Sequence, residues 1–220
     1  MKATLAFDIY GTLIDTHGVI DALTPYFDDH AHAFSAAWRA KQLEYSFRRG
    51  LMQSAVPFSQ CTREALSFCL ASYGKSLSEP QVDDLMAVYG KLPAFDDAER
   101  ALAALSPNSA CWAFSNGEQS AIDQLMAVSG LNTYLRGAVS VEPVASFKPN
   151  PAVYHHFNQQ TQSEPANTFL ISGNPFDVIG AHNVGWQTIW VQRDRRQVFD
   201  VWGASPTYTV SQLSDIIDII

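Results

Sequence analysis

The stretch Ala3-Thr4-Leu5-Ala6-Phe7-Asp8-Ile9-Tyr10-Gly11-Thr12-Leu13 joins an uninterrupted apolar run to a carboxylate and a turn. A short apolar run without polar alternation is typical of a strand that is buried on both faces of a sheet. Asp8 ends this run and Gly11 follows, which indicates a turn at the carboxyl end of the strand. We therefore predict that the fold is built around a buried strand that ends at Asp8.

Four more apolar segments follow along the chain, and helical patterns lie between them. The segments are Cys111–Phe114, Thr168–Ile171, Gln187–Val191 and Tyr208–Val210. The helical patterns are Asp97–Leu105, Glu118–Ser129, Pro151–Gln160 and Phe176–Asn183. Strands that alternate with helices of this length predict an α/β fold with a Rossmann-like parallel sheet.

Residues 15–90 have a different pattern, with helical stretches and no convincing strand. His30–Arg49 and Ser59–Tyr73 are each followed by a glycine, and Ser78 is placed to cap a third helix. A helical cap over the carboxyl ends of the strands would cover the edge where open α/β sheets bind ligands. The predicted parts are a discontinuous core domain of residues 1–14 and 91–220, and an inserted helical cap subdomain of residues 15–90.

The net charge of the chain argues against nucleic acids and anionic membranes as partners. The 220 residues include 22 acidic and 14 basic side chains, which gives a formal net charge of -8. A nucleic-acid binder normally carries a basic excess, and an anionic membrane surface attracts basic segments, so we expect neither partner. The excess of acidic side chains is unfavourable for an anionic substrate at long range. Binding itself depends on the charges within the site, so the net charge does not exclude such a substrate.

The cysteines and the start of the chain bear on the compartment. Cys61, Cys69 and Cys111 are an odd number with no C-x-x-C spacing, so the sequence signals neither a disulfide framework nor a zinc site. The apolar run Ala3–Phe7 is interrupted by Asp8 before a leader could form, and no run reaches the roughly 18 apolar residues of a membrane span. We expect a soluble cytoplasmic protein with reduced cysteines.

Polar residues follow three of the predicted strands. Asp8 comes after the first, Ser115-Asn116 after the second, and Ser172-Gly173-Asn174-Pro175-Phe176-Asp177 after the third. Each of these groups alone is an ordinary turn or helix-start signal. Neighbouring strands of a parallel sheet end at the same edge, so the three groups are expected to converge into one active site.

Five blocks, in order across nearly the whole chain, carry a resemblance to a known family. The blocks are Asp8-Ile9-Tyr10-Gly11-Thr12-Leu13, Trp38-Arg39-Ala40-Lys41-Gln42-Leu43-Glu44-Tyr45, Phe114-Ser115-Asn116-Gly117, Lys148-Pro149 with Tyr154, and Ser172-Gly173-Asn174-Pro175-Phe176-Asp177. They resemble the motifs of the haloacid dehalogenase superfamily and, more narrowly, of the L-2-haloacid dehalogenases. The resemblance implies a haloacid dehalogenase-like fold and a hydrolase that acts on a 2-haloacid.

Two residues differ from the motifs of the wider superfamily, and both differences favour cleavage of a carbon–halogen bond over phosphoryl transfer. Phosphatases of the superfamily carry a second aspartate two residues after the nucleophile, where this chain has Tyr10, and paired carboxylates in the last motif, where it has only Asp177. A halide leaves without a proton, so cleavage of a carbon–halogen bond needs no acid at position 10. A Mg²⁺ site normally takes several oxygen ligands, so we expect no metal and no other cofactor.

The resemblance implies a role for each matching residue. Asp8 is expected to attack C2 of an (S)-2-haloacid and form an ester, with Lys148 keeping it ionised and Arg39 stabilising the departing halide. The other residues expected to take part in catalysis are Thr12, Ser172, Asn174 and Asp177, as the group that positions the hydrolytic water. The residues expected to bind the substrate are Ile9, Tyr10, Leu43, Ser115, Asn116, Tyr154 and Phe176.

Within the binding group, Ser115 and the backbone amides after Asp8 are expected to hold the substrate carboxylate, and Asn116 to assist with the halide. Trp38 and Phe58 are further candidates for an apolar wall around the alkyl group. Arg193-Asp194-Arg195-Arg196 matches no motif and is predicted to be a solvated loop.

Several alternatives stay open. The base that activates water is Lys148 or Asp177. The reaction could instead be another substitution at carbon, such as the opening of a strained-ring acid, or that of a Mg²⁺-dependent phosphatase. A binding protein without activity is a further alternative, although it would not require both Asp8 and Asp177. The resemblance also implies a homodimer, whereas the preferred halogen, the chain length and the natural substrate lie beyond it.

Overall fold

The computed structural model describes residues 2–201 and 203–220, and it contains a six-stranded sheet. The strands are β1 (Thr4–Phe7), β2 (Ala110–Ser115), β3 (Ala138–Ser140), β4 (Thr168–Ser172), β5 (Gln187–Val191) and β6 (Tyr208–Val210). They lie in the order β3-β2-β1-β4-β5-β6, and every pair of neighbours is parallel. The predicted α/β fold with a parallel sheet is confirmed.

Strand β1 lies in the interior of the sheet, where its sequence predicts it. Thr4 is in register with Ala110 of β2 on one side and with Thr168 of β4 on the other. Leu5 and Phe7 point into one apolar cluster and Ala6 into another, because successive side chains of a strand face opposite sides. The run is apolar throughout because both faces of β1 are covered.

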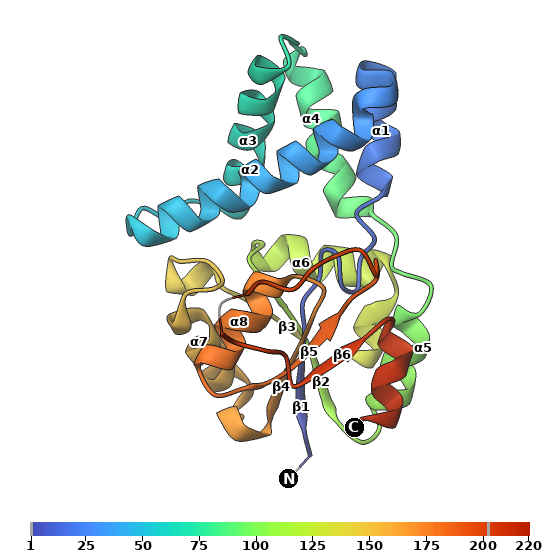
Figure 1. Cartoon of the computed structure of the whole chain (residues 1–220), viewed down its shortest axis with the longest axis vertical. Helices are drawn as coiled ribbons and strands as arrows, with labels where there is room; N and C mark the ends of the chain where they lie inside the picture. Colours follow the sequence, from blue (N-terminus) through green and yellow to red (C-terminus); the bar gives the residue numbers. More distant parts are fainter. Residues whose placement is uncertain (1, 202) are drawn as a thin grey trace.

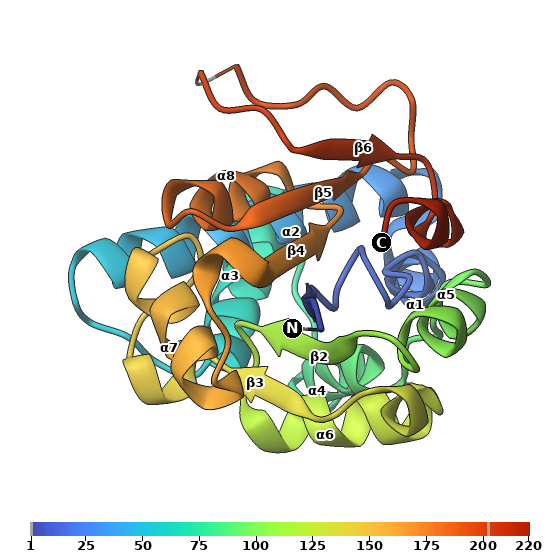
Figure 2. The same cartoon turned by 90° about the horizontal axis from the view of Figure 1, so that it is seen from below.

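Two groups of helices cover the two faces. The longer ones are α5 (Ala98–Leu105), α6 (Gln119–Val128), α7 (Pro151–Thr161) and α8 (Pro175–Asn183). Helices α5 and α6 add their apolar side chains to the cluster that contains Leu5, whereas α7 and α8 add theirs to the cluster that contains Ala6. Figure 2 shows α7 and α8 on one side of the sheet and α5 on the other, next to the helical turn near the C-terminus.

Four helices form a separate layer beyond the carboxyl ends of the strands (Figure 1). They are α1 (Gly18–Phe27), α2 (Ala31–Leu51), α3 (Phe58–Ser72) and α4 (Glu79–Val88). Ser78 precedes α4 and forms a capping box with Gln81, so this predicted cap is confirmed. Short 3-10 turns complete the chain: η1 (Asp28–His30), η2 (Tyr89–Lys91), η3 (Leu131–Tyr134), η4 (Glu142–Val144), η5 (Pro165–Asn167) and η6 (Leu213–Asp218).

The chain enters and leaves the helical layer at adjacent points. Ile14 forms an antiparallel bridge with Ala94. The Asp15 amide donates to the Pro93 carbonyl at 2.9 Å, and the Phe95 amide donates to the Leu13 carbonyl at 2.9 Å. The two connecting segments are therefore tied together beside the turn that follows β1.

Three features differ from the sequence-based expectations. Strand β3 (Ala138–Ser140) was not predicted, because only Val139 among its residues favours strands, whereas all three residues of the equally short β6 do. Helix α1 contains Pro25 in its interior, which weakens the helical signal. Arg193 was expected in a solvated loop, but its guanidinium lies 3.6 Å from the centroid of the Phe95 ring and pairs with Asp97 at 3.1 Å, so this expectation is wrong for Arg193.

None of the helices in the described part of the chain is both long and apolar enough to cross a membrane. The three cysteines are free and buried. Burial raises the pKa of the Cys61 thiol to about 11 and that of the Cys111 thiol to about 12.

Candidate active site

Asp8 lies where β1 turns away from the sheet. Its amide donates to the Ile171 carbonyl at 3.0 Å, which continues the ladder to β4, and the Ile9 carbonyl then accepts the amides of the next turn. The end of β4 approaches this turn closely, since a Cβ placed on Gly173 would lie 2.5 Å from the Gly11 carbonyl oxygen. A glycine at position 173 is therefore required to bring the end of β4 beside Asp8.

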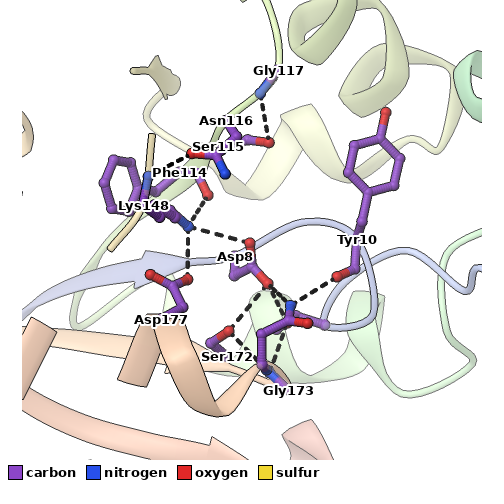
Figure 3. A network of polar contacts seen from close by, with 12 residues as sticks. Asp8, Tyr10, Phe114, Ser115, Asn116, Gly117, Lys148, Ser172, Gly173 and Asp177 are labelled. Atoms are coloured by element: carbon purple, nitrogen blue, oxygen red, sulfur yellow. Dashed lines mark hydrogen bonds and ion pairs between the residues drawn. The ribbon is translucent and has the colours of Figure 1, made fainter. Parts of the chain in front are cut away.

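One oxygen of Asp8, Oδ2, accepts three hydrogen bonds (Figure 3). The donors are Thr12 Oγ1 at 3.0 Å, Ser172 Oγ at 3.1 Å and Asn174 Nδ2 at 2.7 Å. They come from the turn after β1, the end of β4 and the N-cap of α8. Three of the predicted site residues are thereby brought onto a single oxygen atom.

The other oxygen, Oδ1, faces the ammonium of Lys148. Lys148 Nζ lies 3.2 Å from Asp8 Oδ1, 2.8 Å from Asp177 Oδ2 and 2.9 Å from the Phe114 carbonyl oxygen. The side chain is buried, with 1% of the residue exposed, and Nζ also lies 4.1 Å from the centroid of the Phe114 ring. All three partner atoms accept hydrogen bonds, so Nζ uses its three protons as an ammonium.

Asp177 completes the buried cluster. Its Oδ1 accepts a hydrogen bond from the Tyr154 hydroxyl at 2.8 Å, and Oδ2 accepts one from Lys148. Asp177 lies in the first turn of α8 and is fully buried. The arrangement is a row of alternating charges, with Lys148 between the two carboxylates, as Figure 3 shows.

The two carboxyl groups differ in pKa. Burial raises the pKa of Asp8, but Lys148, the Asn174 hydrogen bond, Arg39 and the Thr12 hydrogen bond together outweigh it and hold the pKa below its usual value. Burial raises the pKa of Asp177 to about 6, against the lowering effect of Lys148 and with a further raising effect from Asp8. Asp8 therefore favours the ionised form more than an ordinary aspartate does, whereas Asp177 is protonated more readily, with a pKa of about 6.

The predicted carboxylate-binding and halide-binding groups lie beside this cluster. Asn116 Oδ1 accepts the Lys148 backbone amide at 2.9 Å, which leaves the Nδ2 protons of Asn116 available. Ser115 Oγ accepts the Gly117 amide at 3.2 Å and keeps its own proton to donate. Among the hydrogen bonds found within residues 2–201 and 203–220, none uses the backbone amides of Ile9 and Tyr10.

Arg39 reaches the site from α2. Its Nη1 donates to Gln42 Oε1 at 2.7 Å, and its positive charge helps to lower the pKa of Asp8. Burial raises the pKa values of Tyr10 and Tyr89 to about 12, and Arg39 opposes this rise. A cavity of about 330 Å³ lies around it, between the helical layer and the core. The cavity is lined on the helical side by Arg39, Gln42, Phe58, Thr62, Met86 and Tyr89 and on the core side by Tyr10, Gly117, Glu118 and Ile122.

The other side chains predicted at the site lie outside the cluster of Asp8, Lys148 and Asp177. The Tyr10 ring packs edge to face on Tyr89, with centroids 5.9 Å apart, and burial raises the pKa of Tyr10 to about 12. Phe176 meets Phe47 of α2 at 5.1 Å between centroids. Leu43 is half-buried on α2, outside the group that lines the cavity. Trp38 is fully buried and donates from Nε1 to the Thr62 carbonyl, so it packs within the helical layer.

Sequence reasoning missed three participants. The Phe114 carbonyl accepts a hydrogen bond from the Lys148 ammonium, Gln42 accepts one from Arg39, and Thr62 accepts one from Gln42. A backbone acceptor has no sequence signature. Gln42 was within one of the matched blocks but was assigned no role, and its helical spacing of three from Arg39 was the available signal.

The residues do not fit a divalent cation. Within the described ranges, no three His, Cys, Asp or Glu side chains gather as a metal site would require. The space between the Asp8 and Asp177 carboxylates is filled by Lys148 Nζ, which already bonds to both. The arrangement therefore supports chemistry at a carboxylate that is paired with a fixed ammonium.

Comparisons with known proteins give a consistent result. The family model of haloacid dehalogenase-like hydrolases matches residues 2–185. The chain is 35% identical over 216 residues to (S)-2-haloacid dehalogenase H-109 of Pseudomonas putida, covering 97% of this chain and 96% of that protein. It is 31% identical to haloacetate dehalogenase H-2 of Moraxella sp. strain B, covering 98% and 96%.

The fold is also similar to solved structures. The L-2-haloacid dehalogenase of Xanthobacter autotrophicus with chloropropionic acid covalently bound superposes with a TM-score of 0.94 at 29% identity. The match covers 100% of this chain and 98% of the other.

Proposed function

The chain belongs to the haloacid dehalogenase-like hydrolase family, and from this premise we propose that it is an (S)-2-haloacid dehalogenase. The reaction is hydrolysis of the carbon–halogen bond of a short 2-haloalkanoic acid to the (R)-2-hydroxyacid and halide. One observation carries the proposal: Asp8 is a buried carboxylate whose pKa is held low by a fixed ammonium. The resemblance of the five sequence blocks to this family is confirmed by the comparisons.

In the first step an oxygen of Asp8 attacks C2 of the substrate. The C2–halogen bond breaks, its electron pair leaves with the halide, and an ester forms with inversion at C2. We assign the attack to Oδ1, because Oδ2 already accepts three hydrogen bonds and Oδ1 accepts only one, at 3.2 Å. Burial strips water from this carboxylate and so makes it a better nucleophile.

We propose that Arg39 and Asn116 stabilise the departing halide. Arg39 brings a full positive charge that already lowers the pKa of Asp8, and Asn116 has Nδ2 protons available. Hydrogen-bond donors aimed at charge that develops only in the transition state increase the rate rather than the binding of substrate.

We propose that Ser115 and the Ile9 and Tyr10 amides bind the substrate carboxylate, since each has a proton that the described contacts leave available. Tyr10 and Phe58, which line the cavity around Arg39, would contact the alkyl group. Tyr154 acts through Asp177, to which its hydroxyl donates. An anionic substrate is compatible with the formal charge of -8 because the local groups are Arg39 and Lys148.

In the second step water attacks the ester carbonyl carbon, which is Cγ of Asp8. Oδ2 then becomes the oxyanion of the tetrahedral intermediate, and Thr12, Ser172 and Asn174 are its three donors. We assign the proton of the water to Asp177 rather than to Lys148, because the Lys148 ammonium has no lone pair while its three protons are engaged. When the intermediate collapses the Cγ–Oδ1 bond breaks, Lys148 Nζ donates a proton to the leaving Oδ1 at 3.2 Å, and Asp177 returns the proton taken from water to Lys148 at 2.8 Å. The hydroxyacid leaves with the oxygen that had been Oδ1, and Asp8 regains a carboxylate oxygen from water.

We further propose that residues 15–90 are a cap subdomain and that residues 1–14 and 91–220 are the core domain. The bridge between Ile14 and Ala94 supports boundaries at these two points. The cap would supply Arg39 to a site that is otherwise built at the end of the sheet.

We also propose a homodimer in the cytoplasm. Leu51 and Met52, at the end of α2, are 87% and 65% exposed, which supports burial of this end of the helix against a second copy. The three buried free thiols support a reducing compartment.

The test is halide release from L-2-chloropropionate by the wild type and by Asp8→Asn, each with and without EDTA. We expect chelator-resistant release by the wild type and none by Asp8→Asn, because an amide is not a nucleophile here. A single turnover in H2(18)O should yield lactate without the label, since its new oxygen comes from Asp8. Absence of halide release from chloro- and bromo-acids, or robust Mg²⁺-dependent phosphatase turnover, would refute the proposal.

A further inference from the structure

The guanidinium of Arg39 is held by a chain of hydrogen bonds that runs from α2 into α3. We propose that Gln42 and Thr62 are positioning residues that aim Arg39 at the leaving halide. This inference rests on the proposed function, because it concerns the group that the departing halide meets. Neither residue touches the reacting atoms.

The chain of hydrogen bonds has a defined direction. Thr62 Oγ1 donates its one proton to the Phe58 carbonyl at 3.0 Å, so towards Gln42 the hydroxyl is an acceptor. Gln42 Nε2 donates to that hydroxyl, and this fixes which end of the amide faces Arg39. Gln42 Oε1 therefore faces Arg39 and accepts from Nη1 at 2.7 Å.

Burial makes this direction hard to reverse. Gln42 is 2% exposed and Thr62 is 4% exposed, and a flipped amide would place its NH2 group against a guanidinium that has no acceptor atom. The Thr62 carbonyl also accepts from Trp38 Nε1 at 2.8 Å, and this bond ties α2 to α3 one residue before Arg39. The two helices are thus locked together at the residues that set the position of Arg39.

A guanidinium has five donors in a fixed plane, so anchoring one nitrogen orients the others. Nη1 is engaged by Gln42, which leaves Nη2 and Nε for an anion in the cleft. Loss of the anchor should therefore impair the departure of the halide. The effect should be larger for chloride than for bromide, because chloride is the poorer leaving group and depends more on donors in the transition state.

The experiment compares Thr62→Val with Thr62→Ser. Valine has the shape of threonine but cannot accept from Gln42, whereas serine keeps the hydroxyl. We expect Thr62→Val to lower kcat/KM for L-2-chloropropionate roughly five- to tenfold, and less for L-2-bromopropionate. Thr62→Ser should restore both values to near the wild type. Ser67→Ala is the matched control, since it removes a similar hydroxyl bond to a carbonyl on α3, at an exposed position.

An equal loss with both substrates, or no loss, would overturn the inference, because a merely structural defect does not distinguish leaving groups. Crystal structures of the wild type, Thr62→Ser and Thr62→Val give a readout that does not need activity. The Arg39–Gln42 bond should persist in the first two and be lost in Thr62→Val. If the wild type released no halide, the proposed function would fail, while retention of this bond in Thr62→Val would separately refute the positioning role.

Discussion

The site has two halves that are built in different ways. On the sheet side, Lys148 and Asp177 are 1% and 0% exposed, and each charge is matched by a partner of opposite sign. On the helical side, Arg39 is half-buried, faces a cavity of about 330 Å³ and has one hydrogen bond, to Gln42. The sheet side sets the protonation state of Asp8, the proposed nucleophile, while the helical side holds the cavity that we propose receives the alkyl group and the halide.

The two halves should respond differently to mutation. Removing one member of a buried ion pair leaves an uncompensated charge and typically destabilises a protein by about 3–5 kcal/mol. A half-exposed side chain near a cavity can be replaced at little cost in stability, since water and neighbouring side chains fill its place. Substitutions on the sheet side should therefore lower both stability and activity, whereas substitutions on the helical side should lower activity with little effect on stability.

The largest effect is expected for Lys148→Met. Without the ammonium, the pKa values of Asp8 and Asp177 should both rise, and the two buried carboxylates should face each other unpaired. We expect a loss of about 3–5 kcal/mol in the free energy of unfolding, measured in urea, together with loss of halide release. Lys75→Met, at an exposed position, is the matched control and should retain both. A stable and active Lys148→Met would show that the sheet side is not what fixes the nucleophile.

Arg39→Ala should lower kcat strongly and leave the fold intact. If Arg39 stabilises the departing halide, its removal should cost about 10²–10³ in kcat, the usual effect of losing a transition-state donor. The free energy of unfolding should change by less than about 1 kcal/mol. Arg48→Ala, on the exposed face of the same helix, should leave both values near those of the wild type. A large loss of stability in Arg39→Ala would contradict the contrast between the two halves.

Tyr154→Phe should move the acid limb of the pH–rate profile. The Tyr154 hydroxyl stabilises the ionised form of Asp177, so its removal should raise the pKa of Asp177 above its present value of about 6. We expect the acid limb of kcat to move upward by roughly 1 pH unit or less, with no new alkaline limb. An unchanged limb would argue against Asp177 as the base.

The raised pKa of Asp177 also affects stability. Because its folded value lies above the unfolded value of 3.8, the group contributes stability that is fully present below about pH 3.8 and is lost as the pH rises through about 6. Asp177→Asn should remove this dependence between pH 4 and 6, as measured by urea unfolding at several pH values.

The smallest effect is expected where the two halves touch at the surface. Ser59 Oγ donates to Glu118 Oε1, which links α3 to the residue before α6 at an exposed position. We expect Ser59→Ala to change the free energy of unfolding by about 0.5 kcal/mol and kcat/KM by less than about twofold. A much larger change in kcat/KM would show that this surface contact holds the helical layer in place.

The sequence predicted the sheet side of the site better than the helical side. Asp8, Ser172 and Asp177 follow buried strands, and the topology of a parallel sheet alone brings them together. The position of Arg39 depends on how α2 packs on α3, through Trp38, Gln42 and Thr62, and such contacts leave no periodic pattern. The same reason explains the wrong expectation for Arg193, whose partners Phe95 and Asp97 lie almost 100 residues earlier.

Two elements, β3 and α1, were not predicted from the sequence. Strand β3 was missed because only Val139 of its three residues favours strands, and α1 because of its internal proline. The missing strand did not affect the predicted site, since β3 lies at the edge of the sheet, beyond β2.

The position of β1 inside the sheet has a consequence for folding. Asp8 is made early, but its bonded partners Lys148, Ser172 and Asn174 lie 140, 164 and 166 residues later. The pairing of β1 with β4 has the same wide separation, so the central strand cannot complete its ladder during most of synthesis. Contacts of this range slow folding because a long loop must close first. The hydrogen bonds around Asp8 therefore cannot form until β4 and the segment that carries Lys148 have docked beside β1.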